Sequence, residues 1–248
     1  MTDQAATVRP DRRAELAAGL ARVRARIADA CAAAGRNRAE VTMIAVTKTY
    51  PAGDVLALAG LGVTDMGENR DQEAAPKAAE VAAAGVGVRW HFVGQLQRNK
   101  ARSVVRYADV VHSVDSVRLA RALDAAATAG RDRTLDALVQ VSIDGDPARG
   151  GALPDSTDPD RGLEPVADAL AGAAGLRLAG LMAVAPLGWE PERAFARLAE
   201  VAARLRQRHP RATALSAGMS GDLEQAIAHG ATHVRVGSAL LGMRPTLR

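Results

Sequence analysis

The feature that most constrains the fold of this chain is a regular alternation of apolar runs with helix-like segments. The runs are rich in valine, isoleucine, leucine and alanine, and each has the length of a buried strand. We predict eight strands, at residues 41–48, 63–67, 88–94, 109–114, 135–143, 176–184, 212–216 and 232–236. The helices predicted between them are 54–61, 71–84, 97–107, 116–130, 163–173, 191–208 and 220–229. This alternation is typical of parallel strands joined by right-handed helical crossovers.

Eight strand–helix units in 248 residues indicate one α/β architecture, the closed (β/α)8 TIM barrel. No linker divides the chain, so we predict a single domain over residues 1–248. An extra helix at 11–34 precedes the first strand, and its apolar face is formed by Leu16, Leu20, Val23 and Ile27. A doubly wound open sheet is the alternative, but the Gly-x-Gly-x-x-Gly sequence that commonly follows its first strand is absent.

Composition and charge narrow the functional classes. The net charge is +4, but the arginines are scattered among acidic residues and only 2% of residues are aromatic, which disfavours a nucleic-acid partner. Cys31 is the sole cysteine, which excludes an intrachain disulfide and fits a reducing compartment. Residues 1–10 lack the apolar core of a signal peptide and are expected to be flexible, and no apolar run has membrane-spanning length. We expect a cytoplasmic, monomeric protein without a membrane partner.

One segment interrupts the alternation. Residues 144–162 are rich in aspartate, glycine and proline and are too long for an ordinary βα loop. The segment follows the fifth predicted strand, so it should lie on the carboxyl-terminal face of the barrel, where active sites of this fold are built. A lid over the site and a disordered insertion are both open interpretations.

The first predicted strand ends on a lysine. Only three of the 32 Lys and Arg residues are lysines, and Lys77 and Lys100 lie in polar, helix-like stretches that need no special explanation. An amine at the end of a buried strand, by contrast, is costly to desolvate unless it is paired or deprotonated. A deprotonated amine can form a Schiff base with a carbonyl compound, which arginine cannot do. Lys48 is therefore a candidate for Schiff-base formation, with a side chain that extends to water as the alternative.

Two further motifs are expected on the same face of the barrel. In Gly67-Glu68-Asn69-Arg70, the asparagine either orients a ligand or caps the following helix. In the segment 216–222, Ser216, Ser220 and two glycines offer hydroxyl and backbone N–H groups to a phosphate, while Ser220 also suits a helix cap.

The eighth predicted strand supplies a third motif, Arg235-Val236-Gly237-Ser238. Arg235 and Gly237 share one side of the strand, and an arginine inside a barrel needs an acceptor or an anion. Ser238 begins a short helix at the place where this fold usually binds phosphate. Two strand residues span roughly 6.6 Å, which is about the reach from the pyridine nitrogen to the phosphate of pyridoxal 5′-phosphate (PLP). We therefore predict PLP as the ligand.

These motifs resemble the pyridoxal phosphate homeostasis proteins (the YggS/PROSC family), which are similar to the barrel domain of alanine racemase. The resemblance covers about residues 11–245. Its matching stretches are Ala45-Val46-Thr47-Lys48, Gly67-Glu68-Asn69-Arg70, residues 90–100, Gly180-Leu181-Met182, Gly218-Met219-Ser220-x-Asp222 and Arg235-Val236-Gly237-Ser238. Ala217 and Leu241 are apolar departures from the family pattern, and Ser142 stands where asparagine is frequent.

The resemblance implies a role for each candidate site residue. Lys48 would hold PLP as a covalent internal aldimine, and Arg235 would face the pyridine nitrogen. The residues around the phosphate would be Ser216, Met219, Ser220, Gly237 and Ser238. Asn69 would lie on the side of the ring hydroxyl. No metal is implied.

The function expected from these residues is PLP homeostasis, in which the protein buffers the vitamin B6 cofactor or delivers it to PLP-dependent apo-enzymes with little or no turnover. An arginine beside the pyridine nitrogen favours its neutral form, a weak electron sink. The full racemase also uses a tyrosine from an additional domain, for which we expect no counterpart here. The alternatives are a racemase-like PLP enzyme that uses Tyr50 or His91, and a class I aldolase whose lysine binds substrate directly. His91, flanked by aromatic residues, better suits a hydrogen-bonded core position.

Overall fold

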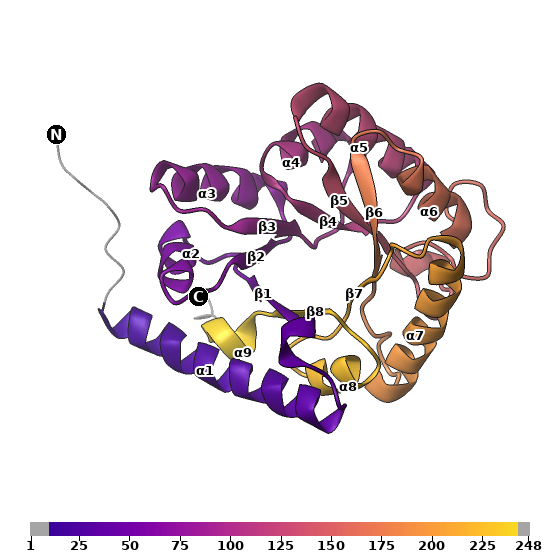
Figure 1. The fold of residues 1–248 in the computed structure, drawn as a ribbon. Coiled ribbons are helices and arrows are strands. Elements are labelled where there is room, and N and C mark those ends of the chain that lie inside the picture. Colours follow the sequence, from indigo (N-terminus) through magenta and orange to yellow (C-terminus); the bar gives the residue numbers. More distant parts are fainter. Residues whose placement is uncertain (1–9, 243–248) are drawn as a thin grey trace.

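The computed structural model describes residues 10–242 and contains eight parallel strands that close into a barrel in chain order (Figure 1). The strands are β1 (Thr42–Val46), β2 (Asp65–Glu68), β3 (Arg89–Phe92), β4 (Val110–Val114), β5 (Leu135–Gln140), β6 (Leu176–Met182), β7 (Ala214–Ser216) and β8 (His233–Val236). Each overlaps its predicted range. The prediction of a (β/α)8 barrel in a single α/β domain is confirmed. Residues 1–9, for which flexibility was expected, lie outside the described residues.

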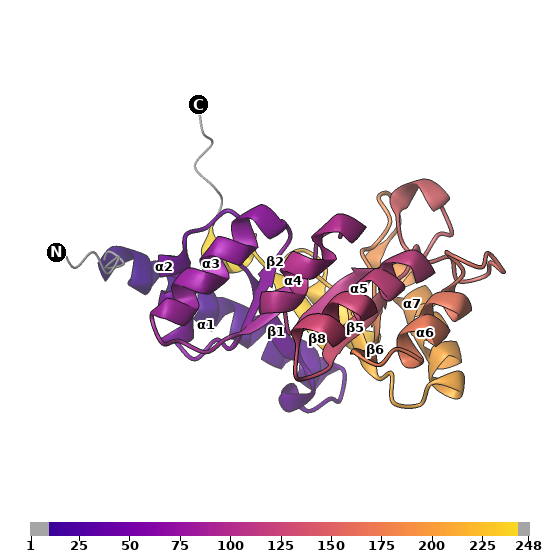
Figure 2. The same ribbon diagram turned by 90° about the horizontal axis from the view of Figure 1, so that it is seen from above.

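The helices form an outer ring around the strands (Figure 1, Figure 2). They are α1 (Pro10–Ala33), α2 (Ala52–Ala59), α3 (Asp71–Ala83), α4 (Ala101–Tyr107), α5 (Val117–Gly130), α6 (Leu163–Ala171), α7 (Pro191–Arg208), α8 (Leu223–Ala228) and α9 (Ser238–Leu241). Three short 3-10 helices, η1 (Arg38–Glu40), η2 (Arg98–Lys100) and η3 (Pro147–Arg149), complete the elements. Within residues 10–242, every helix is too short or too polar to cross a bilayer.

The extra helix α1 lies along α9 and α8 at the side of the barrel (Figure 1). Its predicted apolar face is buried, with exposed fractions between 0% and 3% for Leu16, Leu20, Val23 and Ile27. Gly19 permits the close contact with α9, because a Cβ atom there would lie 2.3 Å from the carbonyl oxygen of Leu240. This contact holds α9, which begins with Ser238, against the barrel.

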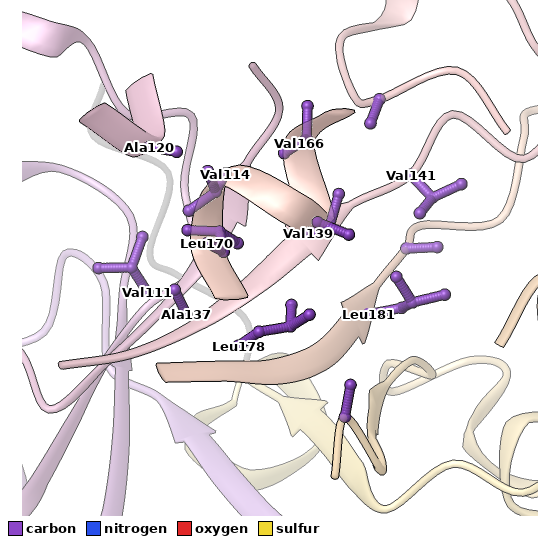
Figure 3. Close-up of a cluster of buried hydrophobic side chains, with 14 of the residues drawn as sticks. Val111, Val114, Ala120, Ala137, Val139, Val141, Val166, Leu170, Leu178 and Leu181 are labelled. Atoms are coloured by element: carbon purple, nitrogen blue, oxygen red, sulfur yellow. The ribbon is translucent and has the colours of Figure 1, made fainter. Parts of the chain in front are cut away.

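Apolar side chains fill the layer between the strands and the helices. Figure 3 shows part of this layer, where side chains of β4, β5 and β6 pack toward α5 and α6. Burial of apolar surface stabilises the fold by about 25 cal/mol per Å². Because these side chains are closely packed, they hold the strands in place and fix the positions of the loops that follow them.

The segment 144–162 is folded rather than disordered. It contains η3, an isolated bridge ties its Ala152 to Val141 just after β5, and a second bridge, between Leu153 and Gly162, lies within the segment. Three ion pairs join it to α5 and α7: Arg118–Asp160 and Arg197–Asp155 at 2.6 Å, and Arg204–Asp155 at 3.0 Å. The interpretation of this segment as a disordered insertion is therefore wrong. None of its residues lines the cavity described below, so it does not act as a lid in this conformation.

Candidate functional site

A cavity of about 650 Å³ opens on the carboxyl-terminal face of the barrel. The strand register explains its position, because Ala45 of β1 pairs with Met66 of β2 and Val236 of β8, which places three strand ends side by side. The cavity is lined by Val46, Lys48, Tyr50, Asn69, Val93, Gly94, Val184, Met219, Ser220, Gly221, Arg235, Gly237, Ser238 and Gly242. Seven of the eight candidate site residues are therefore brought together, and Ser216 is not among the lining residues. The volume lies in the range of small-ligand sites.

Lys48 reaches the cavity from a turn rather than from the end of a strand. β1 stops at Val46, and Lys48 is half-buried two residues later, which corrects the expectation of a buried strand-end amine. The next residue, Thr49, has a φ of 68°, the one positive φ at a non-glycine position in the described chain. This conformation is strained for a β-branched residue. It is supported by a hydrogen bond of 3.0 Å from the Thr49 N–H to Glu73 Oε2.

The buried lysine is Lys77 of α3, which is 7% exposed. Its Nζ donates hydrogen bonds to Glu68 Oε1 over 2.6 Å and to the carbonyl oxygen of Thr47 over 2.9 Å. The Thr47 hydroxyl donates to the same Glu68 oxygen over 2.7 Å. Burial raises the pKa of Glu68, and the hydrogen bonds from Lys77 and Thr47 oppose this rise. The expectation that Lys77 needs no special explanation is wrong, since it anchors the residue that precedes Lys48.

Arg235 of β8 points into the barrel and is 6% exposed. Its Nη1 donates to both the carbonyl oxygen and Oγ of Ser216 over 2.8 Å, and its Nη2 donates to the Ala183 carbonyl oxygen over 2.9 Å. A guanidinium carries five N–H donors, so these three bonds leave two donors for the cavity. Burial lowers the pKa of Arg235 to about 10, and Asp222 partly opposes this. No carboxylate in the described chain is hydrogen-bonded to this guanidinium.

Asn69 presents an unsatisfied acceptor at the cavity wall. Its Oδ1 is buried and has no hydrogen-bond partner within residues 10–242. The helix-cap interpretation is wrong, because α3 starts after Arg70 and has no side-chain cap. Gly94 of the neighbouring loop lets the Asn69 backbone lie close, since a Cβ atom on Gly94 would be 2.1 Å from the Asn69 carbonyl oxygen. A buried acceptor without a donor costs free energy, so this oxygen is available to a ligand.

Two serines meet at another edge of the cavity. The Ser238 hydroxyl donates to Ser220 Oγ over 3.4 Å, and both residues line the cavity with Gly237. The cap interpretation of Ser220 is wrong, because α8 begins only after Asp222. Asp222 Oδ1 instead accepts a hydrogen bond of 2.6 Å from the Met219 N–H, which fixes the shape of this loop.

Ser216 lies beneath Arg235 and is 0% exposed. Besides the bond from Arg235, its Oγ is 3.0 Å from His112 Nδ1. His112 Nε2 is in turn 2.9 Å from His91 Nδ1, and His91 Nε2 is 2.9 Å from Asp65 Oδ1. His91 is thus a hydrogen-bonded core histidine, as its neighbours in the sequence indicate, and it does not line the cavity. Ser216, for which the resemblance implies a place beside a phosphate, is bonded in this structure to Arg235 and His112 and does not line the cavity.

Sequence reasoning missed His112 and His233, whose ring centroids lie 6.3 Å apart inside the barrel. The signal available for His112 was a pair of polar residues, His112 and Ser113, in the middle of an apolar strand. The importance of Gly94 had no local signal, because it depends on the position of Asn69.

Tyr50 also lines the cavity, and its hydroxyl is committed to the backbone. It donates to the Gly242 carbonyl oxygen over 2.8 Å. The Arg12 guanidinium lies 5.5 Å from the centre of the ring and is itself bonded to Asp54. These contacts hold Tyr50 as part of the cavity wall.

Proteins of similar sequence identify the family of this chain. The chain is 48% identical over 248 residues to the pyridoxal phosphate homeostasis protein of Mycobacterium tuberculosis (strain H37Rv), and the match covers 95% of each. The chain belongs to this family. The alanine racemase, N-terminal domain family also matches, over residues 19–245.

Solved structures with the same fold support the family assignment of this chain. PipY of Synechococcus elongatus PCC7942, a structure with PLP bound, matches with a TM-score of 0.78 and 36% identity, covering 92% of this chain and 100% of that one. The fold is shared with the alanine racemase of Streptomyces coelicolor A3(2), with a TM-score of 0.70 and 22% identity over 94% of this chain and 59% of that one. No group of three or more His, Cys, Asp or Glu side chains in residues 10–242 is placed to hold a metal ion.

Proposed function

We propose that this protein binds PLP in the cavity, covalently through a Schiff base with Lys48, and that it buffers the cofactor or delivers it to PLP-dependent apo-enzymes. The observation that carries the proposal is the convergence of one amine, one arginine with unused donors and two serines on a single cavity. The family relationship supports it, because the relatives are named for PLP homeostasis and PipY was solved with PLP bound.

The residues present fit this cofactor. Arg235 offers N–H donors, which suit the lone pair of a pyridine nitrogen. Asn69 Oδ1, a buried acceptor without a donor, suits the hydroxyl side of the ring. Ser220, Gly237 and Ser238 offer hydroxyl and backbone N–H groups to the phosphate. When bound, PLP supplies an aldehyde that an amine can attack and a ring that accepts electrons.

The chemistry of these residues supports a protein with little or no catalytic turnover. A guanidinium does not give up its proton readily, so Arg235 stabilises a neutral pyridine nitrogen and leaves the ring a weak electron sink. The two residues considered for a racemase-like acid or base are poorly placed. His91 lies outside the cavity lining, and the Tyr50 hydroxyl is bonded to the Gly242 carbonyl oxygen. Tyr50 nevertheless lines the cavity, so the racemase-like alternative rests on this one residue.

Absorption spectroscopy and peptide mapping test the proposal. Purified protein mixed with PLP should show an imine band, and borohydride reduction followed by peptide mapping should place the pyridoxyl group on Lys48. Label on Lys77 or Lys100 would show that the site is misassigned. Exchange of the α-proton of amino acids into deuterated water separates a carrier from a racemase. A substrate imine without any PLP band would favour the class I aldolase.

A further inference from the structure

A continuous line of polar side chains runs through the barrel interior beneath the cavity. It connects Arg235 of β8 to Ser216 of β7, His112 of β4, His91 of β3 and Asp65 of β2, with successive distances of 2.8, 3.0, 2.9 and 2.9 Å. The first four side chains are at most 6% exposed, and the Asp65 side chain is 15% exposed. Polar groups buried to this extent persist in a core when they satisfy one another, so the line forms a unit.

The chemistry of its two ends allows one direction in which every hydrogen bond of this line has a donor and an acceptor. A guanidinium can only donate, so Ser216 Oγ accepts from Arg235 and keeps its own proton to donate to His112 Nδ1. A neutral His112 then carries its proton on Nε2 and donates it to His91 Nδ1. His91 carries its proton on Nε2 and donates to Asp65, whose ionised carboxylate can only accept.

The charges around the line favour this neutral arrangement. Burial holds the pKa of His112 well below its usual value, and the neighbouring His91, Arg235, His233 and Arg89 lower it further. At the far end, burial alone would raise the pKa of Asp65, but the hydrogen bonds from His91 and Thr64 outweigh it and keep the carboxylate ionised. The neutral His112 ring therefore belongs to a line that ends in the Arg235 cation and the Asp65 anion.

We propose that His112 is a positioning residue for Arg235, and that His91 and Asp65 hold His112 in the tautomer that this requires. Ser216 has a rotatable hydroxyl, and an acceptor at His112 Nδ1 draws its proton away from the arginine. Within residues 10–242, none of the groups that accept a hydrogen bond from Arg235 is a carboxylate. The orientation of the guanidinium therefore depends on neutral acceptors. With the guanidinium held in this way, its two remaining N–H donors stay available at the cavity that Arg235 lines. The proposal rests on the proposed function, because these donors are the ones proposed to bind PLP.

Imidazole ¹⁵N NMR of the unmodified, cofactor-free protein tests the line directly. The five histidines can be assigned by single substitutions. At neutral pH, His112 should carry its proton on Nε2 and leave Nδ1 free to accept from Ser216. A proton on Nδ1 of His112 overturns the proposal. This measurement needs no variant to fold and no PLP to bind, so it stays decisive even if the proposed function fails.

Equilibrium dialysis with PLP tests the consequence for Arg235. His112→Leu removes the acceptor for Ser216 and should raise the Kd for PLP about tenfold, the factor typical of one lost hydrogen bond. His112→Asn can still offer an oxygen to Ser216 and should restore most of the affinity. The matched control is His233→Gln, which changes another interior histidine that contacts Thr232 rather than Ser216. Equal affinities in His112→Leu and the unmodified protein, or an equal loss in His233→Gln, would overturn the positioning role.

Discussion

The amine of Lys77 lies 2.6 Å from Glu68 Oε1, and the two side chains are 7% and 1% exposed. The same amine donates to the carbonyl oxygen of Thr47, the residue directly before Lys48. The ion pair between α3 and β2 therefore fixes the start of the loop that presents Lys48 to the cavity. Removing one partner of such a pair leaves an unpaired buried charge, which is far more costly than the pair is stabilising.

The first prediction concerns this ion pair. Lys77→Met should lower the free energy of unfolding by about 3–5 kcal/mol, because Glu68 is left buried without its cation. The double variant Lys77→Met/Glu68→Gln should recover part of the loss. Urea unfolding at neutral pH measures both. The matched control is Lys100→Met, because the Lys100 side chain is 34% exposed and lies 3.8 Å from its nearest carboxylate oxygen, on Asp71. Equal losses in the two single variants would contradict the special position of Lys77.

The second prediction concerns the packing of Gly94 against the loop that carries Asn69. Gly94→Ala would place a Cβ atom 2.1 Å from the Asn69 carbonyl oxygen, so the loop must move. We expect a loss of stability of about 1–3 kcal/mol, typical of overpacking, together with weaker PLP binding because Asn69 is displaced. Chemical unfolding and equilibrium dialysis measure the two effects. Gly87→Ala is the control, since nothing lies within 4 Å of its added Cβ atom. If Gly94→Ala loses stability but binds PLP as tightly as the unmodified protein, Asn69 does not contact the ligand.

The fold could be predicted from the sequence because its signal is local and repeated. Each strand is a short apolar run and each helix has its own periodicity, so eight small inferences reinforce one another. The candidate site could be predicted in part for the same reason. Lys48, Asn69 and Arg235 follow or end strands, and the fold brings strand ends together on one face.

The remaining features depend on contacts between distant residues, which no local pattern encodes. Lys77 looked like an ordinary helix residue because its partner, Glu68, lies across the interface between α3 and β2. Ser216 was assigned to the phosphate because serines beside glycines suit one, yet the barrel turns its oxygen toward Arg235 and His112. Side-chain direction at a strand end is decided by its neighbours, and these neighbours come from two other strands, β8 and β4.

The third prediction concerns the stability of the protein in acid. Burial, together with His91 and Arg89, lowers the pKa of His233 to about 4 from 6.5. Between these values the unfolded chain binds a proton at this site and the folded protein does not, so stability falls as pH falls from 6.5 toward 4. One pKa unit corresponds to about 1.4 kcal/mol, so His233 contributes roughly 3 kcal/mol to this loss. His112, whose pKa is also lowered, adds to it in the same direction.

Urea unfolding across this pH range tests the contribution of His233. His233→Gln, which does not titrate, should show a shallower loss of stability between pH 6.5 and 4 than the unmodified protein. The control is His229→Gln, a histidine hydrogen-bonded to Glu192 outside the barrel interior. The prediction concerns the slope with pH rather than the absolute stability, so a uniform destabilisation by the substitution does not affect it. Identical slopes in His233→Gln and the unmodified protein would contradict it.

The last prediction is that the phosphate, more than the covalent bond, holds the cofactor. It rests on the two loops that bring Ser220, Gly237 and Ser238 to one edge of the cavity. A dianionic phosphate there gains several charge-assisted hydrogen bonds, each worth roughly 1.5–3 kcal/mol. A Schiff base, by contrast, is reversible and releases its aldehyde on hydrolysis. Lys48→Ala should therefore lose the imine band and still bind PLP measurably.

Ser238→Asp places a negative charge where the phosphate is proposed to bind, and it leaves Lys48 intact. Its Kd for PLP should rise at least about tenfold above that of the unmodified protein, through charge repulsion at short range. Its Kd should also exceed that of Lys48→Ala. Ser238→Asn introduces a neutral side chain of nearly the same size as the one in Ser238→Asp. It should bind PLP much better than Ser238→Asp, which isolates the effect of charge. Equilibrium dialysis on the three variants shows whether the phosphate contacts or the covalent bond to Lys48 contribute more to PLP binding. If Ser238→Asp retains PLP better than Lys48→Ala, the phosphate does not bind at this edge of the cavity.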